Sequence, residues 1–327
     1  MTYILLTGAG FSRNWGGWLA NEAFEYLLGA PEVDDAVRRM LWDDKLRNNG
    51  FEDTLARLQS AQSNRPDPER EKRLNALTAA LVGMFNAMGL AFVRRQFEPQ
   101  NDTRYLVRTF LSKFDAIFTL NQDTLLELHY LDDNIMLGSA GRWNGWQIPG
   151  MQPIRLGLPV TVDHGRIAVQ VPKTSDQFRV EPSRQPYFKL HGSANWNCGI
   201  GRILIMGGDK AGSIERFPVL AWYHDRFVDY LQHSDTKLMV IGYSFGDRHI
   251  NEAIRGAVDT SLKMFIIDPA GVDVLDKRDK RAAISPPVDA YMEKIMPNVI
   301  GASRRPLTAI FNNDRVEHDK IMRFFSD

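Results

Sequence analysis

The sequence has 327 residues, enough for one large domain or for a core domain with a sizeable insertion. Its 40 Lys and Arg residues balance 40 Asp and Glu residues, so no overall charge draws the protein to nucleic acid or to an anionic membrane. Cys198 is the single cysteine, which excludes a disulfide framework and a zinc site built only from cysteines of one chain.

Residues 3–12, YILLTGAGFS, predict a buried strand that runs into a glycine turn and the start of a helix. The two glycines allow a sharp turn and a close approach to a ligand, and free N–H groups at a helix start favour phosphate. The candidate nucleotide-binding residues here are Gly8, Ala9, Gly10, Phe11 and Ser12. Arg13 stands where a dinucleotide fingerprint has its third glycine, so a tight turn without a ligand remains an alternative.

Helical periodicity dominates residues 30–110, which we expect to form a helical insertion between the first and second strands of the core. Apolar stripes at helical spacing are more often packing surfaces than functional sites. Glu52 and Asp53 head one of these helices, so we expect them to act as capping residues without a chemical role.

Residues 114–120, FDAIFTL, predict a second strand, and Asn121 and Asp123 follow it directly. Open α/β sheets place their ligands just beyond the carboxyl ends of parallel strands. Asp123 has an equally good alternative role as a helix cap, whereas Asn121 is harder to explain by structure alone.

Residues 134–186 are rich in Gly, Pro and Trp and predict a small β excursion, an inserted module or lid. A third strand then ends in His191 and Gly192, and the glycine is expected to leave the imidazole room to face a cleft. We expect this imidazole to titrate near neutrality. The other six histidines are interpreted as structural, and a structural role for His191 itself remains an alternative.

The stretch TKLMVIGYSFGDRHINEAI predicts another strand and a second glycine turn, with candidate ligand-binding residues Gly242, Ser244 and Phe245. Asp247 is well placed to cap the helix that follows. Asp268, at the tip of a further strand, could accept hydrogen bonds from a ribose or simply form a turn before Pro269.

Strands that alternate with helices indicate an α/β fold, a Rossmann-like three-layer sandwich with a mainly parallel sheet. We expect a single domain over residues 1–327 with a C-terminal helical segment at 272–327. No run of about 18 apolar residues stands out and the first strand begins at residue 3, so we expect a cytoplasmic protein without a membrane span or signal peptide.

These motifs, in this order, resemble the sirtuin family. The family has a GAG turn followed by Ser, an Asn and Asp pair after a strand, a catalytic His in an HG pair and a GxS turn, and binds NAD with these loops. The matching residues are Gly8, Ala9, Gly10, Ser12, Asn121, Asp123, His191, Gly192, Gly242 and Ser244. Each motif is unspecific alone, but four in sequence are fairly specific.

The sequence departs from protein-deacylating sirtuins on the substrate side. It lacks their four-cysteine zinc module and their Asp-Phe-Arg run, reading RNWGGWLAN after the first turn. The wording GYSFGDRHINEAI looks closer to bacterial sirtuin-like proteins of antiphage defence. That resemblance implies NAD hydrolysis, a partner such as a HerA-type ATPase or an Argonaute-like protein, and no zinc. We also expect a homo-oligomer and no direct contact with nucleic acid or membrane.

The resemblance and the residue chemistry together suggest roles for the candidate residues. The first glycine turn would hold the pyrophosphate, and Ser12 and Ser244 would bind phosphate or ribose. Asn121 would orient water or ribose hydroxyls, and His191 would be the general base. A NAD-dependent deacylase and a non-catalytic NAD or ADP-ribose sensor remain alternatives.

Overall fold

A central sheet of seven parallel strands organises the computed structural model, which describes residues 1–47, 49–131, 142–154, 168–199, 201–276 and 290–326. The strand order is β11-β10-β9-β1-β2-β6-β3, and every described pair in it is parallel. The strands are β1 Thr2–Thr7, β2 Ala116–Thr119, β3 Trp146–Gln147, β6 Gln185–Lys189, β9 Thr236–Ile241, β10 Lys263–Ile267 and β11 Val299–Ser303.

The strand order reverses at β1. From β1 the chain proceeds to β2 and β6 on one side, then crosses to β9, β10 and β11 on the other. Thr7 is in register with Thr119 of β2 and with Ile241 of β9, so the loops after these strands leave the same edge of the sheet. Such a reversal is where open α/β sheets form a ligand crevice.

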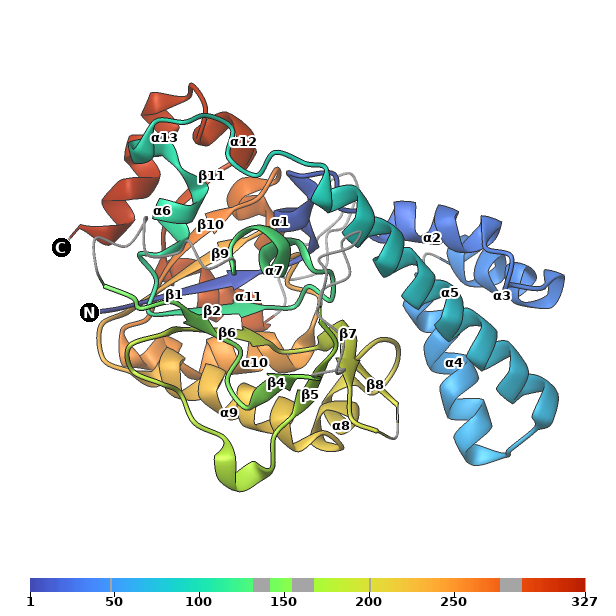
Figure 1. Cartoon of the computed structure of the whole chain (residues 1–327). Coiled ribbons are helices and arrows are strands. Elements are labelled where there is room, and N and C mark those ends of the chain that lie inside the picture. Colours follow the sequence, from blue (N-terminus) through green and yellow to red (C-terminus); the bar gives the residue numbers. More distant parts are fainter. Residues whose placement is uncertain (48, 132–141, 155–167, 200, 277–289, 327) are drawn as a thin grey trace.

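Side chains alternate between the two faces of the sheet and build two separate cores. Leu5 of β1 packs in one core, whereas Ile4 and Leu6 pack in the other. The period of two is what a strand buried on both faces requires. Helices cover each face, which confirms the predicted three-layer α/β sandwich (Figure 1).

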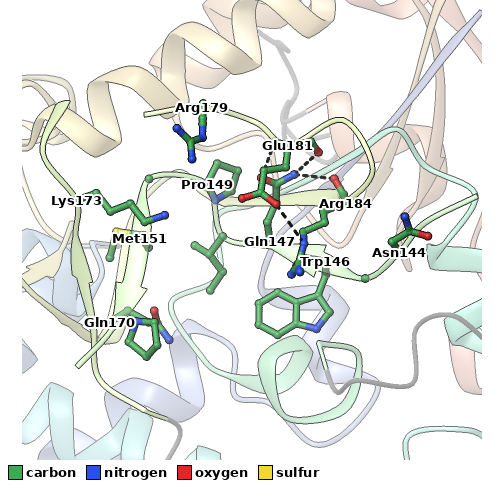
Figure 2. Close-up of a pocket in the computed structure, with 14 residues that line it drawn as sticks. Asn144, Trp146, Gln147, Pro149, Met151, Gln170, Lys173, Arg179, Glu181 and Arg184 are labelled. Carbon is green, nitrogen blue, oxygen red and sulfur yellow. Dashed lines mark hydrogen bonds and ion pairs between the residues drawn. The ribbon is translucent and has the colours of Figure 1, made fainter. Parts of the chain in front are cut away.

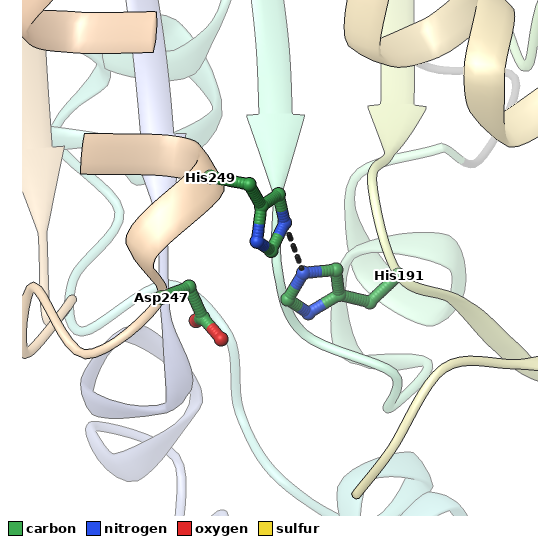
Figure 3. A group of neighbouring side chains, drawn as sticks. All are labelled: His191, Asp247 and His249. Atoms are coloured by element: carbon green, nitrogen blue, oxygen red, sulfur yellow. Dashed lines mark hydrogen bonds between the residues drawn. The ribbon is translucent and has the colours of Figure 1, made fainter. Parts of the chain in front are cut away.

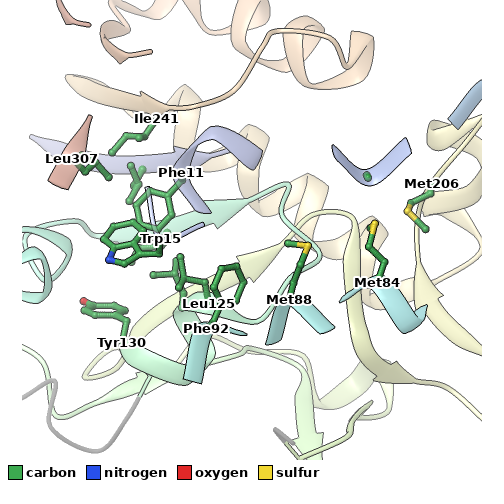
Figure 4. Packing of buried hydrophobic residues seen from close by; sticks show 14 of the residues in the cluster. Phe11, Trp15, Met84, Met88, Phe92, Leu125, Tyr130, Met206, Ile241 and Leu307 are labelled. Carbon is green, nitrogen blue, oxygen red and sulfur yellow. The ribbon is translucent and has the colours of Figure 1, made fainter. Parts of the chain in front are cut away.

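The two helical layers differ in which parts of the chain they use. The core of Leu5 includes residues of α1 Ala9–Arg13, α6 Val107–Leu111, α7 Leu125–His129, α12 Leu307–Ile310 and α13 Arg315–Met322 (Figure 4). The opposite core includes residues of α8 Lys210–Glu215, α9 Pro218–Gln232, α10 Arg248–Gly256 and α11 Ala290–Ile295. Short 3-10 turns are η1 Thr103–Tyr105, η3 Ser175–Gln177, η4 Val258–Thr260, η5 Gly271–Leu275, η6 Met296–Asn298 and η7 Arg323–Phe325.

The segment between β1 and β2 is helical, as its periodicity predicts. It contains α2 Ala20–Gly29, α3 Asp35–Leu46, α4 Phe51–Asn64 and α5 Pro68–Val93, followed by η1 and α6. Helices α2 to α5 pack on one another and extend sideways from the sandwich as an arm (Figure 1). The carboxyl half of α5 returns to the sandwich, where Phe92 and Met88 join the core (Figure 4).

Helix α5 revises the expectation that the chain has no apolar stretch long enough to span a membrane. Its 26 residues include a stretch long and apolar enough to cross a membrane. One face of the helix is buried, with Leu77, Leu81, Met84 and Phe92 in the hydrophobic core. Packing inside the protein therefore accounts for much of the apolar composition of this helix.

A second, smaller sheet lies beside the sandwich. It contains β4 Met151–Pro153, β5 Gln170–Pro172, β7 Gly192–Asn197 and β8 Arg202–Leu204, in the order β4-β5-β7-β8. Its first two strands belong to the predicted β excursion at 134–186, of which residues 134–141 and 155–167 lie outside the described residues.

The predicted C-terminal helical segment is only partly helical. Residues 277–289 lie outside the described part, but β11 at Val299–Ser303 adds an edge strand to the main sheet beside β10. The stretch VIGAS is short and has a glycine, so it carried a weak strand signal. Pairing with β10, and not its own sequence pattern, makes this segment a strand.

Candidate functional site

The two predicted glycine turns pack directly on each other at the carboxyl edge of β1 and β9. A Cβ atom on Gly8 would lie 2.6 Å from the carbonyl oxygen of Gly242, and one on Gly10 would lie 2.7 Å from the Gly242 Cα. Gly242 itself has φ +62° and would place a Cβ 2.3 Å from the Gly10 carbonyl carbon. These glycines are thus required for the contact between two backbones, whether or not a ligand is present.

This contact uses part of the hydrogen-bonding capacity expected for phosphate. The Gly8 N–H donates to Ile241 O at 3.0 Å, and the Gly10 N–H donates to Gly242 O at 2.9 Å. Ala9 is exposed at the tip of the turn. Phe11 is fully buried and packs on Trp15 at a ring distance of 5.2 Å, so its side chain belongs to the core (Figure 4).

Ser12 and Asn121 meet across the first two strands of the core. The Asn121 Nδ2 group donates to Ser12 Oγ at 3.0 Å, and the Asn121 backbone N–H donates to Thr119 Oγ1 at 3.0 Å. Ser12 is buried, whereas Asn121 is half-buried. The first glycine turn thereby fixes the orientation of the amide that follows β2.

Asp123 turns toward the helix that it precedes. Its Oδ1 accepts a hydrogen bond from the Leu125 N–H at 3.0 Å, an Asx-type turn at the start of α7. Its backbone carbonyl accepts from Lys189 Nζ, whose ammonium also pairs with Glu127 Oε1 at 2.5 Å inside the protein. This geometry matches the capping alternative for the Asp123 carboxylate.

His191 lies two residues beyond the end of β6, and its side chain is only 3% exposed. Its Nε2 is hydrogen-bonded to Nε2 of His249 at 3.2 Å, so one ring donates and the other accepts (Figure 3). We predicted that Gly192 gives the imidazole of His191 room to face a cleft, but the structure gives this glycine a different role. It has φ +72° and would place a Cβ 2.0 Å from Ile203 O, so it is needed for close packing against β8.

The expectation that His191 titrates near neutrality is wrong. Burial lowers the pKa of His191 to about 3, because a charged imidazole would lose its hydration, although Asp247 acts in the opposite direction. The pKa values of His249 and His224 are also lowered, mainly by burial. The imidazole of His191 is therefore neutral and carries a free-base lone pair at pH 7.

Asp247 and Glu52 also differ from their predicted roles. The Asp247 carboxylate does not cap α10 but accepts from Lys210 Nζ at 2.8 Å, and Glu52 Oε2 lies 2.8 Å from the same ammonium. Burial raises the pKa of Asp247, but His191 and Lys210 outweigh it, so the net pKa is below its ordinary value. Asp53 keeps its predicted role, accepting from the Gly50 N–H at 2.7 Å. The arm helix α4 thus contributes a charge to the surroundings of His191.

The remaining candidate residues lie at the same edge with different exposure. Ser244 is exposed in the second glycine turn, whereas Phe245 is buried against Tyr243 at a ring distance of 4.9 Å. Asp268 Oδ1 accepts from the Ala270 N–H at 2.8 Å, which fits the turn-forming alternative. Burial raises the pKa of Asp268.

Register places Asn121 and His191 at matching positions. Thr119, the last residue of β2, pairs with Lys189, the last residue of β6, and Asn121 and His191 each lie two residues beyond the end of their strand. By contrast, a polar pocket of about 360 Å³ beside β3 and β4 is lined by Gln147, Arg184 and their neighbours and includes none of the predicted site residues (Figure 2).

Sequence reasoning missed His249, His224 and Lys210. The histidines were interpreted as structural, yet the ring of His249 lies 5.3 Å from that of His191 and 5.8 Å from that of His224. A usable signal was present, because His249 follows a strand that ends at the same sheet edge as β6. Lys210 comes from α8 and had no comparable signal.

Comparisons with known proteins find one family and several solved structures. The family model described as "SIR2-like domain" matches residues 115–286. A solved Sir2 homologue–NAD complex is 12% identical, with 98% of this chain and 90% of that chain covered and a TM-score of 0.39. A mutant Sir2 homologue bound to ADP-ribose is also 12% identical, covering 98% and 93%, with a TM-score of 0.42. No curated protein matches the chain.

Proposed function

Because the chain belongs to the SIR2-like domain family, we propose that it binds NAD at the carboxyl edge of the main sheet and hydrolyses it to nicotinamide and ADP-ribose. One observation carries this proposal. Asn121 lies beside the strand that leads to His191, and it is hydrogen-bonded to Ser12, which follows β1, the strand at which the strand order reverses.

NAD hydrolysis requires the protein to position the substrate and to supply a general base. The bond between nicotinamide nitrogen and ribose C1′ breaks, and nicotinamide leaves as a neutral molecule while positive charge develops on the ribose. Water then forms a bond to C1′ and passes one proton to His191. Asn121, with an uncharged amide, would orient that water or the ribose hydroxyls.

The state of His191 supports a controlled enzyme. A neutral imidazole carries a lone pair, but with a pKa of about 3 it is a weak base in this closed state, where its Nε2 is engaged by His249 and its surface is covered. We propose that catalysis requires the two imidazoles to separate, which would expose the lone pair of His191. A NAD-consuming enzyme that is closed until activated would spare its own cell.

The biological setting is a further part of the proposal. The resemblance of GYSFGDRHINEAI to antiphage sirtuin-like proteins supports a cytoplasmic effector that depletes NAD on a signal. An oligomer of this chain, or a partner such as a HerA-type ATPase, would supply activation. The arm formed by α2 to α5 is the contact surface that we propose, because Glu52 of α4 reaches Lys210 beside the histidines.

A sensor that binds NAD without cleaving it is the second candidate function. The specific observation in its favour is the same closed His191, which is only 3% exposed. The two functions differ in product: a sensor would bind NAD but release no nicotinamide, even with its partner present. A deacylase would consume NAD only when an acylated peptide is added.

The test is nicotinamide release by the purified chain, alone and with the product of any adjacent gene. We expect His191→Ala to lower the rate by about 10²- to 10⁴-fold, the usual contribution of a general base. Asn121→Ala should lower it as well, while the exposed His233→Ala serves as the matched control. NAD binding without turnover in the wild type would favour the sensor, and full turnover in folded His191→Ala would remove this residue from the mechanism.

A further inference from the structure

Two imidazoles and one carboxylate converge at the start of α10. His191 comes from the loop after β6, Asp247 directly precedes α10, and His249 is the second residue of that helix (Figure 3). The potential ligand atoms of these three side chains all lie within 4.8 Å of one another. Imidazole and carboxylate together form a donor set that Zn²⁺ and similar ions bind.

The separation of the two imidazoles suits a shared metal ion. Zn–N bonds of about 2.0–2.1 Å at a tetrahedral angle put two nitrogen ligands about 3.3 Å apart. The Nε2 atoms of His191 and His249 are 3.2 Å apart, which is close to the separation of two nitrogen ligands of one ion. A carboxylate oxygen of Asp247 lies within 4.8 Å of a ring nitrogen of each histidine, close enough to be the third ligand.

The local charge favours a cation. Lys210 Nζ lies 2.8 Å from Asp247 Oδ1 and 2.8 Å from Glu52 Oε2, so one ammonium faces two carboxylates. With uncharged imidazoles, this group of side chains carries one net negative charge. Lys210 nevertheless competes with a metal ion for the Asp247 carboxylate, which predicts how a variant should behave.

We propose that His191, Asp247 and His249 bind one divalent transition-metal ion, with water as the fourth ligand, and that the bound ion inhibits the protein. The inhibition rests on the proposed function, because the metal would take the lone pair that His191 needs as a base. The metal site itself does not depend on that function.

Direct binding tests the site without any activity assay. The full chain, freed of metal with a chelator, is titrated with Zn²⁺ in competition with a chromogenic zinc indicator. We expect one ion per wild-type chain and at least tenfold weaker binding in Asp247→Asn and in His249→Gln. Exposed His233→Gln and Cys198→Ser, the sole cysteine, should bind as the wild type does. Absence of stoichiometric binding by the wild type, or binding unchanged in both ligand variants, would overturn the proposal.

A variant with the opposite expected sign separates metal binding from damage to the fold. Lys210→Met keeps all three ligands and removes the competing ammonium, so Zn²⁺ should bind several-fold more tightly. A loss of structure would weaken binding instead. Weaker binding in a Lys210→Met protein that unfolds at the wild-type temperature would contradict the proposed ligand set.

Nicotinamide release by the wild type then tests the inhibition. We expect Zn²⁺ to stop NAD hydrolysis at the concentrations at which it binds, with full recovery after a chelator is added. Activation by Zn²⁺ would overturn the inhibitory role. If the wild type binds Zn²⁺ but never cleaves NAD, the proposed function fails and the metal site stands; if it cleaves NAD but binds no Zn²⁺, only this inference fails.

Discussion

Gly242 has no side chain, and this allows the turns after β1 and β9 to pack directly on each other. Its φ of +62° is a conformation that L-residues with a Cβ adopt at a cost, and its α-carbon lies against the backbone of Gly10. The neighbouring atoms are main-chain atoms and not the flexible end of a side chain, so they cannot move aside cheaply. The join between the turns after β1 and β9 therefore depends on this residue.

Gly242→Ala should lower the free energy of unfolding by at least about 2 kcal/mol. The left-handed conformation accounts for about 1–2 kcal/mol, and the contact at 2.3 Å adds to it. Urea unfolding followed by circular dichroism measures the change. Gly256→Ala is the matched control, because Gly256 ends α10 and an added Cβ there would meet nothing within 4 Å, so this variant should be neutral or slightly stabilised. Equal losses in both variants would contradict this account.

Helix α7 is fastened to β6 by a buried charge pair. The side chains of Lys189 and Glu127 are 0% and 4% exposed, and their charged atoms are 2.5 Å apart. Burial raises the pKa of Glu127, and the Lys189 charge acts in the opposite direction. Because Lys189 also donates to the carbonyl of Asp123, the pair positions the start of α7 next to Asn121.

Lys189→Met should destabilise the protein by about 3–5 kcal/mol, because it leaves the Glu127 carboxylate buried without its partner. Thermal unfolding with a urea series measures this loss. Arg248→Met provides the control, because the Arg248 guanidinium pairs with Glu252 on the surface and 81% of the Arg248 side chain is exposed. This variant should lower the free energy of unfolding by less than about 1 kcal/mol. Restoring most of the stability with Lys189→Met/Glu127→Leu would support the charge explanation, and a loss below about 1 kcal/mol in the single variant would refute it.

Much of the sandwich was predictable because its strands are marked by local pattern. The buried strands at β1, β2, β9 and β10 are apolar runs that end in glycine or polar residues, and a parallel sheet brings such ends to one edge. The same reasoning predicted that Asn121 and His191 would lie at this edge. Strand β11 was not predicted, because VIGAS has little pattern of its own and becomes a strand through pairing with β10.

The interactions around His191 were not predictable in the same way. Glu52, Lys210 and His249 come from α4, α8 and α10, and only tertiary packing brings their charged and polar atoms together. We predicted a helix cap for Glu52 because a local sequence pattern carries information only about the neighbouring backbone. Burial of His191 likewise depends on elements far away in sequence, so its pKa could not be inferred from its position after a strand.

Across the whole molecule, buried neutral histidines predict sensitivity to acid. The pKa of His191 is lowered to about 3, and those of His129, His224 and His249 are lowered as well, mainly through burial. In the unfolded chain each imidazole regains a pKa near about 6.5. The unfolded state therefore binds more protons below about pH 6.5, and the stability that these groups contribute is present above that pH and lost as the pH falls through their lowered pKa values, that of His191 lying at about 3.

His191 alone should lower the free energy of unfolding by about 1.4 kcal/mol between pH 7.5 and pH 5.5, because over that interval only the unfolded state takes up its proton. Urea unfolding at the two pH values measures the difference. In His191→Gln the loss should shrink by about this amount, whereas exposed His233→Gln should keep the wild-type loss. Glu98 and Glu127, whose pKa values are raised by burial, contribute with the opposite sign, but they are common to all three proteins and cancel in the comparison. An equal pH dependence in both variants would show that His191 is charged, or already accessible to protons, in the folded protein.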